Sequence, residues 1–415
     1  MSLYREVLPT WRPGAALAIV GEAPGANEVL LGESFVGPSG KLLDKMLTMA
    51  GLARRDVSLT NLVQRRPLDN DFEAAMYVPR VSTLAGSGRK KHLLQPSDEL
   101  REWTALLWAE LEAAQADGLR VAVACGNEVL QVLTGLRNIA ARRGSAWRLP
   151  SGLWVVALLH PAAILHGAQW EELIIGAHVL ERARWLAEHP VWQPRAWTGL
   201  VATGEEAASW ITETAASAFR WSVDLETIPA ADGKPPAVSV LGLARTLLNG
   251  ETEALCVPWP TAQHWQALGR LVALAQSCLV NHHLAYDAAW LDLHGVHVTA
   301  PYMDTMQTWH HQHPELPKGL DFAAMWHLGA ELPYWKSEGR HLHGKRRTNQ
   351  EQLDYWQYNQ KDSVAALWLS YELDKAAPRS VRYQWLSQTW SLAREMTQRG
   401  LPLNSHAVKQ ASCTI

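Results

Sequence analysis

The chain of 415 residues has few cysteines and few phenylalanines, and its charges nearly cancel. None of its four cysteines forms a C-x-x-C pair, so neither a zinc site nor an iron–sulfur cluster is indicated, and a reducing compartment is favoured. The net charge of −3 provides no global basic field for nucleic acid, although local basic tracks remain compatible with it. The sequence shows no signal peptide and no apolar run of membrane-spanning length, so we expect a cytoplasmic protein without a membrane partner.

Tryptophan is abundant instead, with 21 residues against four phenylalanines, and we expect most of them in the core and a few stacked on bases. The length allows two or three domains. Predicted strands at residues 15–20, 57–63, 119–124 and 154–159 alternate with helices, which predicts a parallel, three-layer α/β domain. Sites in such domains lie at the carboxyl ends of the strands. Residues 68–94 lack periodicity and are predicted to form a long surface loop.

Four short motifs follow these strands: GEAPG at residues 21–25, FVG at 35–37, TNLV at 60–63 and HPAA at 160–163. In this order and spacing they resemble the uracil-DNA glycosylase superfamily, most closely its family 4, over about residues 14–188. The resemblance implies DNA as partner and a pocket for a uracil flipped out of the duplex.

By this resemblance Phe35 would stack on the uracil, Asn61 would hydrogen-bond its Watson–Crick edge, and His160 would stabilise the charge on the leaving base. Glu22, or alternatively Glu28, would place the attacking water. The residues by themselves leave plainer roles open: a core phenylalanine, a turn-forming asparagine, a structural histidine and, for Glu28, a solvated loop charge. The basic residues at 65–66 and 89–91 would suit backbone phosphates or simply be solvated.

The sequence departs from family 4 in its cysteines. Members of that family hold an iron–sulfur cluster with four of them, whereas here none precedes Cys125, and Gln64 to Arg66 stand where one ligand would lie. We therefore expect no iron–sulfur cluster. Two interpretations of this domain stay open: an active glycosylase, or a catalytically inactive module that binds uracil or DNA.

Residues 221–227 (WSVDLET) alternate strictly, which predicts a strand with one apolar face and with Asp224 and Glu226 on the other. Two neighbouring carboxylates on one face suit Mg²⁺ or Mn²⁺, the alternative being a solvated strand face. Two further strands, at 238–244 and 254–257, predict a meander. A strand at 278–281 then leads to Asp287 near the first turn of a helix, where a cap or a helix-dipole partner is the plain interpretation.

A capping box at residues 348–351 begins a helix on which Tyr358 and Asp362 share a face. Together with Asp224-x-Glu226 and Asn281 to Asp287, this pair resembles the three exonuclease motifs of the DEDD superfamily, in its tyrosine branch. The stretches at 304–306 and 314–321 are similar to the proofreading domain of phage-type family A DNA polymerases. The resemblance covers about residues 218–376.

This second resemblance implies an RNase H-like fold and a two-metal site for Mg²⁺ or Mn²⁺, held by Asp224, Glu226, Asp287 and Asp362. Tyr358 would orient the attacking water, Asn281 would contact substrate, and single-stranded 3′ ends of DNA would be the substrate. Lys361 would touch a phosphate or be solvated. The histidines at 282–283 and 310–313 have poor spacing for zinc.

We thus predict a glycosylase-like domain at residues 1–190, a linker at 191–200, a 3′–5′ exonuclease domain at 201–382, and a helical tail at 383–415. The tail resembles the start of a family A polymerase domain, which does not follow, so the chain is either a fragment or an exonuclease that stands alone. We expect a DNA-processing enzyme of bacterial or phage-infected cytoplasm, with a DNA polymerase domain or subunit as a further partner. A non-enzymatic DNA-binding protein is the third possibility.

Overall fold

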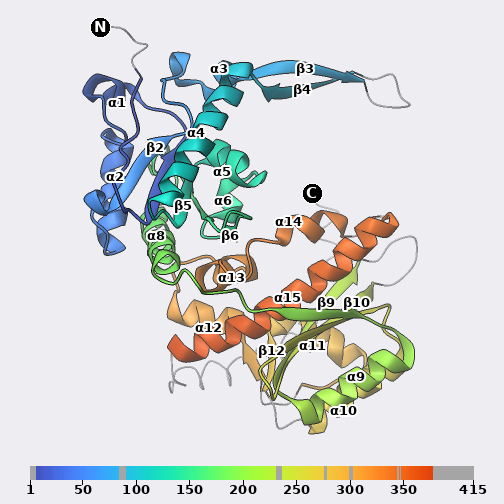
Figure 1. The fold of residues 1–415 in the computed structure, drawn as a ribbon. Coiled ribbons are helices and arrows are strands. Elements are labelled where there is room, and N and C mark those ends of the chain that lie inside the picture. The colour runs from blue at the N-terminus through green and yellow to red at the C-terminus, as the bar shows by residue number, and fades with distance from the viewer. Residues whose placement is uncertain are drawn as a thin grey trace, which may run out of the picture. The chain divides into compact units, whose positions relative to one another are not determined.

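The computed structural model describes residues 6–83, 90–229, 236–274, 278–298, 302–343, 345 and 347–376 (Figure 1). Contacts divide the chain into two units. Unit 1 is Met1–Arg195 with Leu328–Tyr334, and unit 2 is Ala196–His327 with Trp335–Ile415. Every helix in the described part of the chain is too short or too polar to cross a lipid bilayer.

Unit 1 is built on a five-stranded sheet in the order β2-β1-β5-β7-β6. Its strands are β1 (Leu17–Gly21), β2 (Val57–Asn61), β5 (Val121–Cys125), β6 (Ala146–Arg148) and β7 (Trp154–Leu158). All but β6 are parallel and buried along their whole length, as continuous apolar runs predict for a sheet covered on both faces. The edge strand β6 is antiparallel to β7.

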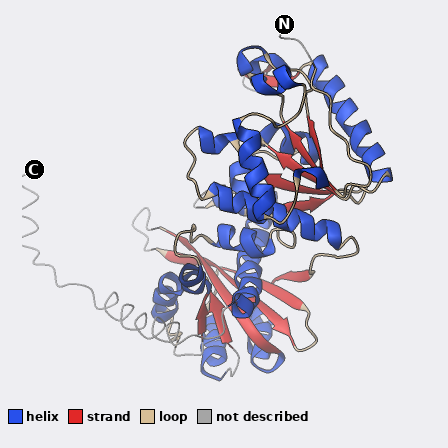
Figure 2. Cartoon of the chain, turned by 90° about the vertical axis from the view of Figure 1, so that its left-hand side faces the viewer, coloured by secondary structure: helices blue, strands red, loops and turns tan. Residues whose placement is uncertain are grey.

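Helices cover both faces of this sheet (Figure 2). They are α1 (Ala26–Leu31), α2 (Pro38–Met49), α3 (Phe72–Met76), α4 (Asp98–Ala116), α5 (Asn127–Thr134), α6 (Ile139–Arg142), α7 (Ala162–Leu165) and α8 (Glu172–Glu188), with short 3₁₀ turns at Arg54–Asp56 and Leu68–Asn70. Leucines of α4 pack with alternate residues of β1, β5 and β7. Helix α8 contacts the same three strands and also packs against α2. This layering confirms the predicted α/β class of the first domain.

The prediction of a long surface loop at residues 68–94 was wrong for the residues that the structure describes there, 68–83 and 90–94. This stretch contains α3 and an antiparallel hairpin of β3 (Tyr77–Thr83) and β4 (Lys90–Pro96), paired from Tyr77 opposite Pro96 to Thr83 opposite Lys90. Two strands of a hairpin satisfy each other's backbone groups, so they form without the alternating pattern of a half-buried strand. Arg89 lies outside the described residues.

Unit 2 contains a six-stranded sheet in the order β13-β12-β9-β10-β11-β8. Its strands are β8 (Trp197–Val201), β9 (Ala218–Ile228), β10 (Ala237–Leu247), β11 (Thr252–Pro258), β12 (Cys278–Asn281) and β13 (Tyr302–Asp304). Strands β9, β10 and β11 form the predicted antiparallel meander, and β12 and β13 continue the sheet in parallel from β9. The mixed sheet with its flanking helices confirms the α/β class of this unit and agrees with an RNase H-like fold.

Two boundaries differ from those predicted. Residues 197–201, predicted as part of a linker, form β8. The backbone N–H and C=O groups along the free edge of β11 hydrogen-bond to this further parallel strand. Residues 328–334, predicted within the second domain, belong to unit 1: Ala146 N donates to Gly329 O at 2.8 Å, and Tyr334 N to Ser145 Oγ at 2.9 Å. The helical tail predicted beyond residue 382 lies outside the described residues.

The helices of unit 2 place one long helix against the meander. They are α9 (Gly204–Ser217), α10 (Ala262–Leu274), α11 (Leu284–Leu293), α12 (Thr305–Gln312), α13 (Leu320–Leu328), α14 (Lys336–Gly339), the 3₁₀ turn Arg340–Leu342 and α15 (Asn349–Ala376). Trp221, Val223 and Leu225 of β9 point into the apolar core, as predicted. Helix α15 contacts β9, β10, β11 and β12. It approaches closely at Gly242, where a Cβ atom would lie 2.2 Å from Asn359 Oδ1.

Candidate functional sites

A cavity of about 220 Å³ lies at the carboxyl ends of β1, β2 and β7 in unit 1. Its lining includes Glu22, Phe35, Asn61 and His160, the four residues that the sequence motifs single out. Glu28 lines it as well, together with Asn70 and Phe72 from the stretch mistaken for a loop, a contribution that no sequence signal predicted. The parallel topology explains the convergence, because strands that run the same way end at the same edge of the sheet.

Phe35 and Asn61 are held tightly in this cavity. Asn61 ends β2 directly beside Gly21, is 5% exposed, and donates from Nδ2 to Ser34 Oγ at 3.4 Å. Phe35 is equally buried and has a φ of +56°, a conformation that L residues adopt at a cost of order 1 kcal/mol and that clusters at functional sites. Its ring stacks with that of His160, with centroids 6.3 Å apart.

Gly21 makes room for both side chains. A Cβ atom there would lie 2.4 Å from Asn61 Oδ1 and 2.7 Å from Phe35 Cζ. We expect Gly21→Ala to displace both and to lower the free energy of unfolding of unit 1 by about 1–3 kcal/mol, the usual cost of overpacking. Urea unfolding measures this. Gly269→Ala in α10, where the nearest atom would lie at 3.9 Å, should have no such cost; equal stability of the two variants would contradict the crowding at Gly21.

His160 is fixed as a neutral imidazole. Its Nδ1 accepts a hydrogen bond from Ala162 N at 3.1 Å, so the single ring proton is on Nε2. Burial is the main cause that lowers the pKa of His160 from its ordinary value to about 4. A site with this histidine therefore offers a neutral hydrogen-bond donor at physiological pH.

The lowered pKa has a measurable consequence. Between pH 4 and 6.5 the unfolded chain binds a proton at this residue that the folded chain does not, so the contribution of His160 makes stability rise with pH across this window. Titration of the His160 ring by NMR should give a pKa near 4. A pKa near 6.5 would show that the imidazole is solvated.

Two glutamates differ in environment. Glu22 follows β1, and its Oε1 accepts from Glu128 N at 3.4 Å, at the start of α5; burial raises its pKa. Glu28 is 7% exposed and accepts from Gly37 N at 2.8 Å, so the interpretation as a solvated loop charge was wrong. Its hydrogen bond ties the start of α2 to α1 and keeps the carboxylate at the cavity wall.

The residues of unit 1 do not fit an iron–sulfur cluster. Its described residues include one cysteine, Cys125, which is buried in β5, and no cysteine comes earlier in the sequence. Gln64 instead donates to Glu110 Oε1 at 2.9 Å, and Arg65 pairs with Glu99 at 2.5 Å. Polar side-chain pairs thus occupy the segment after β2.

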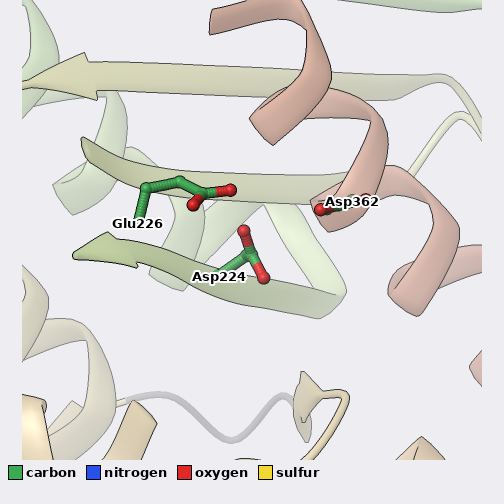
Figure 3. Close-up of side chains that lie close together, drawn as sticks. All are labelled: Asp224, Glu226 and Asp362. Atoms are coloured by element: carbon green, nitrogen blue, oxygen red, sulfur yellow. The ribbon is translucent and has the colours of Figure 1, made fainter. Parts of the chain in front are cut away.

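Three carboxylates gather in unit 2 (Figure 3). Asp224 and Glu226 come from β9 and Asp362 from α15, with ligand oxygens all within 4.8 Å of one another. Glu226 and Asp362 are 5% and 4% exposed, so this is not a solvated strand face. Carboxylate oxygens in such a group fit a divalent cation.

Asp287 lies outside this group of three but belongs to the same electrostatic neighbourhood. It stands in the first turn of α11, is buried, and receives a hydrogen bond from Asn281 Nδ2 at 2.6 Å; the same amide donates to Val223 O at 2.7 Å. Its Oδ1 is buried and has no hydrogen-bond partner among the described residues. An orphaned carboxylate oxygen beside an acidic cluster fits a second metal ion better than it fits a helix cap.

Burial and mutual repulsion make the metal-free cluster unfavourable when fully ionised. Burial, followed by the charge of Asp362, raises the pKa of Asp224 well above its ordinary value and that of Glu226 to about 8. Burial raises the pKa of Asp287 to about 7. Positive charge placed among these groups would relieve the repulsion.

Several residues that contact the acidic cluster were not predicted from the sequence. Trp335 Nε1 donates to Asp362 Oδ1 at 2.6 Å, and Lys336 Nζ lies 2.7 Å from Asp362 Oδ2. Asn359 Nδ2 donates to Asp224 Oδ2 at 2.8 Å. Asn359 follows Tyr358 on a helix that the motifs identify, so its role beside the cluster could have been predicted. Trp335 and Lys336 belong to no motif, and the sequence gives no signal for them.

Glu226 has two partners of its own. His343 Nε2 lies 3.0 Å from Glu226 Oε2, and Tyr355 OH donates to the same oxygen at 3.2 Å. Tyr355 precedes Tyr358 by three residues and shares its helix face, which is a readable signal. Tyr358 itself is 4% exposed, and burial raises the pKa of its hydroxyl.

The remaining predicted residues have other partners. Lys361 pairs with Glu338 at 2.5 Å on the surface of α14 and α15. His282 contacts Thr305 Oγ1 at 2.9 Å and Lys318 O at 3.0 Å, and burial lowers its pKa to about 3, which describes a structural histidine.

Residues 9–187 match the family model described as the uracil DNA glycosylase superfamily. The type-4 uracil-DNA glycosylase of Archaeoglobus fulgidus is 32% identical over 166 residues, which are 38% of this chain and 71% of that protein. Among solved structures, the Aedes aegypti Nibbler EXO domain is similar with a TM-score of 0.33 and 15% identity, over 43% of this chain and 87% of that one. Brucella melitensis NrnC bound to pGG is similar with a TM-score of 0.33 and 13% identity, over 49% and 91%.

Proposed function

Because this chain belongs to the uracil-DNA glycosylase superfamily through residues 9–187, we propose that unit 1 excises uracil from DNA and that unit 2 is a metal-dependent 3′–5′ exonuclease. We assign the first activity to Met1–Arg195 with Leu328–Tyr334, and the second to Ala196–His327 with Trp335–Ile415. For unit 1, the observation that carries the proposal is one cavity lined by Glu22, Phe35, Asn61 and His160. For unit 2 it is the group of Asp224, Glu226 and Asp362 beside the orphaned oxygen of Asp287.

In unit 1 the extruded uracil enters the cavity and stacks on Phe35, and contacts there offset the few kcal/mol that extrusion costs. The Asn61 amide both donates and accepts, as the Watson–Crick edge of uracil requires. His160 donates its Nε2 proton in a hydrogen bond to the uracil oxygen on which negative charge develops as the glycosidic bond breaks. The Glu22 carboxylate positions the water that attacks the sugar.

In unit 2 the four acidic residues would hold two divalent metal ions, Mg²⁺ or Mn²⁺, which when bound would supply Lewis-acid activation of water and charge neutralisation at the scissile phosphate. Tyr358 orients the attacking water, from a face of α15 that also carries Asp362. Asn281 is 1% exposed and holds Asp287 by the 2.6 Å hydrogen bond, so it acts by positioning Asp287 rather than by the substrate contact that the sequence resemblance implied. Single-stranded 3′ ends are bound by backbone and stacking contacts rather than by base identity.

The resemblance of residues 304–306 and 314–321 to proofreading domains supports a role beside a DNA polymerase domain or subunit. A second candidate for unit 1 is a uracil sensor that binds without cleaving. The absence of cysteines before Cys125 favours this alternative, because it is the one departure from the family 4 pattern that the sequence resemblance brings out.

One experiment separates these activities. A 5′-labelled single strand, with or without one uracil, is incubated with the full chain in EDTA or in Mg²⁺. We expect an alkali-sensitive site at the uracil in EDTA, and a ladder of 3′-shortened products that requires Mg²⁺. Tight binding of the uracil strand without an abasic product would make unit 1 a sensor, and an intact 3′ end in Mg²⁺ would overturn the exonuclease.

A further inference from the structure

Lys336 places an ammonium group inside the acidic cluster of unit 2. Its Nζ lies 2.8 Å from Asp362 Oδ1 and 2.7 Å from Asp362 Oδ2, and it donates to Tyr358 OH at 3.2 Å. The side chain is only 15% exposed. An ammonium group has three protons, so these contacts to two of the cluster's central residues use its whole capacity.

The same contacts occupy the side of Asp362 that a metal ion would need. Both carboxylate oxygens accept from Lys336, and Oδ1 also accepts from Trp335 Nε1 at 2.6 Å. A divalent cation coordinated by Asp362 therefore has to replace at least one hydrogen bond of Lys336. The Lys336 ammonium and a divalent cation bound to the same carboxylate would also repel each other strongly in a buried site.

The backbone that carries Lys336 is held in place by packing, whereas its ammonium is held by the hydrogen bonds to Asp362 and Tyr358. Gly339, the last residue of α14, lies so close to Tyr358 that a Cβ atom there would be 2.2 Å from the ring. Glu338 of α14 pairs with Lys361 of α15 at 2.5 Å. The helix is thus held against α15, but the four-carbon stem of lysine allows its ammonium to swing away without backbone movement.

We propose that Lys336 is a resident counter-ion that competes with divalent metal for Asp362 and so sets the metal concentration at which the cluster fills. The inference rests on the proposed metal dependence of unit 2. In the metal-free chain Lys336 offsets the repulsion among the carboxylates and keeps Asp362 and Tyr358 in place. As metal binds, the ammonium leaves Asp362 and stays near enough to meet the negative charge of a bound phosphate.

The test is Mn²⁺ binding to the full chain, followed by the EPR signal of free Mn²⁺, with no nuclease activity in the readout. We expect Lys336→Met to lower the half-saturating Mn²⁺ concentration at least about tenfold, because metal no longer displaces a charged hydrogen-bond donor. Lys336→Arg keeps the charge and should bind Mn²⁺ no more tightly than the unaltered chain. Lys375→Met, which removes an exposed ammonium paired with Glu372 near the end of α15, serves as the control and should leave binding unchanged.

A second measurement on the unaltered chain covers the case in which Lys336→Met does not fold. Reductive methylation, quantified by mass spectrometry, should modify Lys336 faster with Mn²⁺ than without, because the ammonium is released from Asp362. Unchanged Mn²⁺ affinity in Lys336→Met, or unchanged methylation, would make Lys336 a purely structural ion pair and overturn the inference. If the unaltered chain and Lys336→Met both fail to bind Mn²⁺, the proposed nuclease itself is wrong.

Discussion

A chain carrying Asp224→Asn should lose 3′–5′ exonuclease activity about a thousandfold, if the metal site contributes roughly 4 kcal/mol to transition-state stabilisation. The substitution keeps the shape of the side chain and an oxygen that can accept from Asn359 Nδ2. It removes one negative charge from a group in which Asp224, Glu226 and Asp362 lie within 4.8 Å. The measurement is the rate of 3′ shortening of a labelled single strand at saturating Mg²⁺.

Stability separates a chemical effect of Asp224→Asn from a folding defect. Because burial and the neighbouring carboxylates raise the pKa of Asp224, its ionised form is unfavourable in the folded, metal-free chain, so a neutral residue should not lower the metal-free melting temperature at pH 8. The control is Asp292→Asn on α11, a carboxylate that pairs with His297 away from the cluster. Full exonuclease activity in a folded Asp224→Asn chain would refute the proposed site.

The second large effect is expected in unit 1. Replacing His160 by alanine should slow uracil excision by about 10²–10³-fold, the usual cost of removing one preorganised donor to a developing negative charge. The donor in question is the Nε2 proton of a neutral ring, which the hydrogen bond from Ala162 N to Nδ1 fixes. Excision is measured in EDTA as alkali-sensitive product, so that the exonuclease of unit 2 does not contribute.

The matched control for His160→Ala is His166→Ala. His166 is exposed, follows α7 and does not line the cavity, so its loss should change excision by less than about twofold, as is usual for surface substitutions. Exonuclease activity in Mg²⁺ should be equal in both variants. If His160→Ala excises uracil at the unaltered rate, the cavity is not a glycosylase site with this histidine as its donor.

The predicted strands of unit 1 were readable because continuous apolar runs such as Ala16 to Val20 leave few alternatives to a buried parallel strand. Strict alternation at residues 221–227 likewise determined which side of β9 faces the core. The motifs at the ends of the predicted strands then identified Asn61 and His160 as candidate site residues. Their meeting in one cavity was predictable because parallel strands place their carboxyl ends at the same edge of the sheet.

The sequence by itself determined the two sets of candidate site residues: Glu22, Phe35, Asn61 and His160 in one, Asp224, Glu226, Asp287 and Asp362 in the other. Only the tertiary structure decided that Tyr77–Thr83 pairs with Lys90–Pro96, that β8 joins the second sheet, and that Lys336 enters the acidic cluster. Backbone pairing and ion pairing are satisfied by whichever partner lies within reach, and reach depends on how distant segments pack rather than on the residues adjacent in the chain.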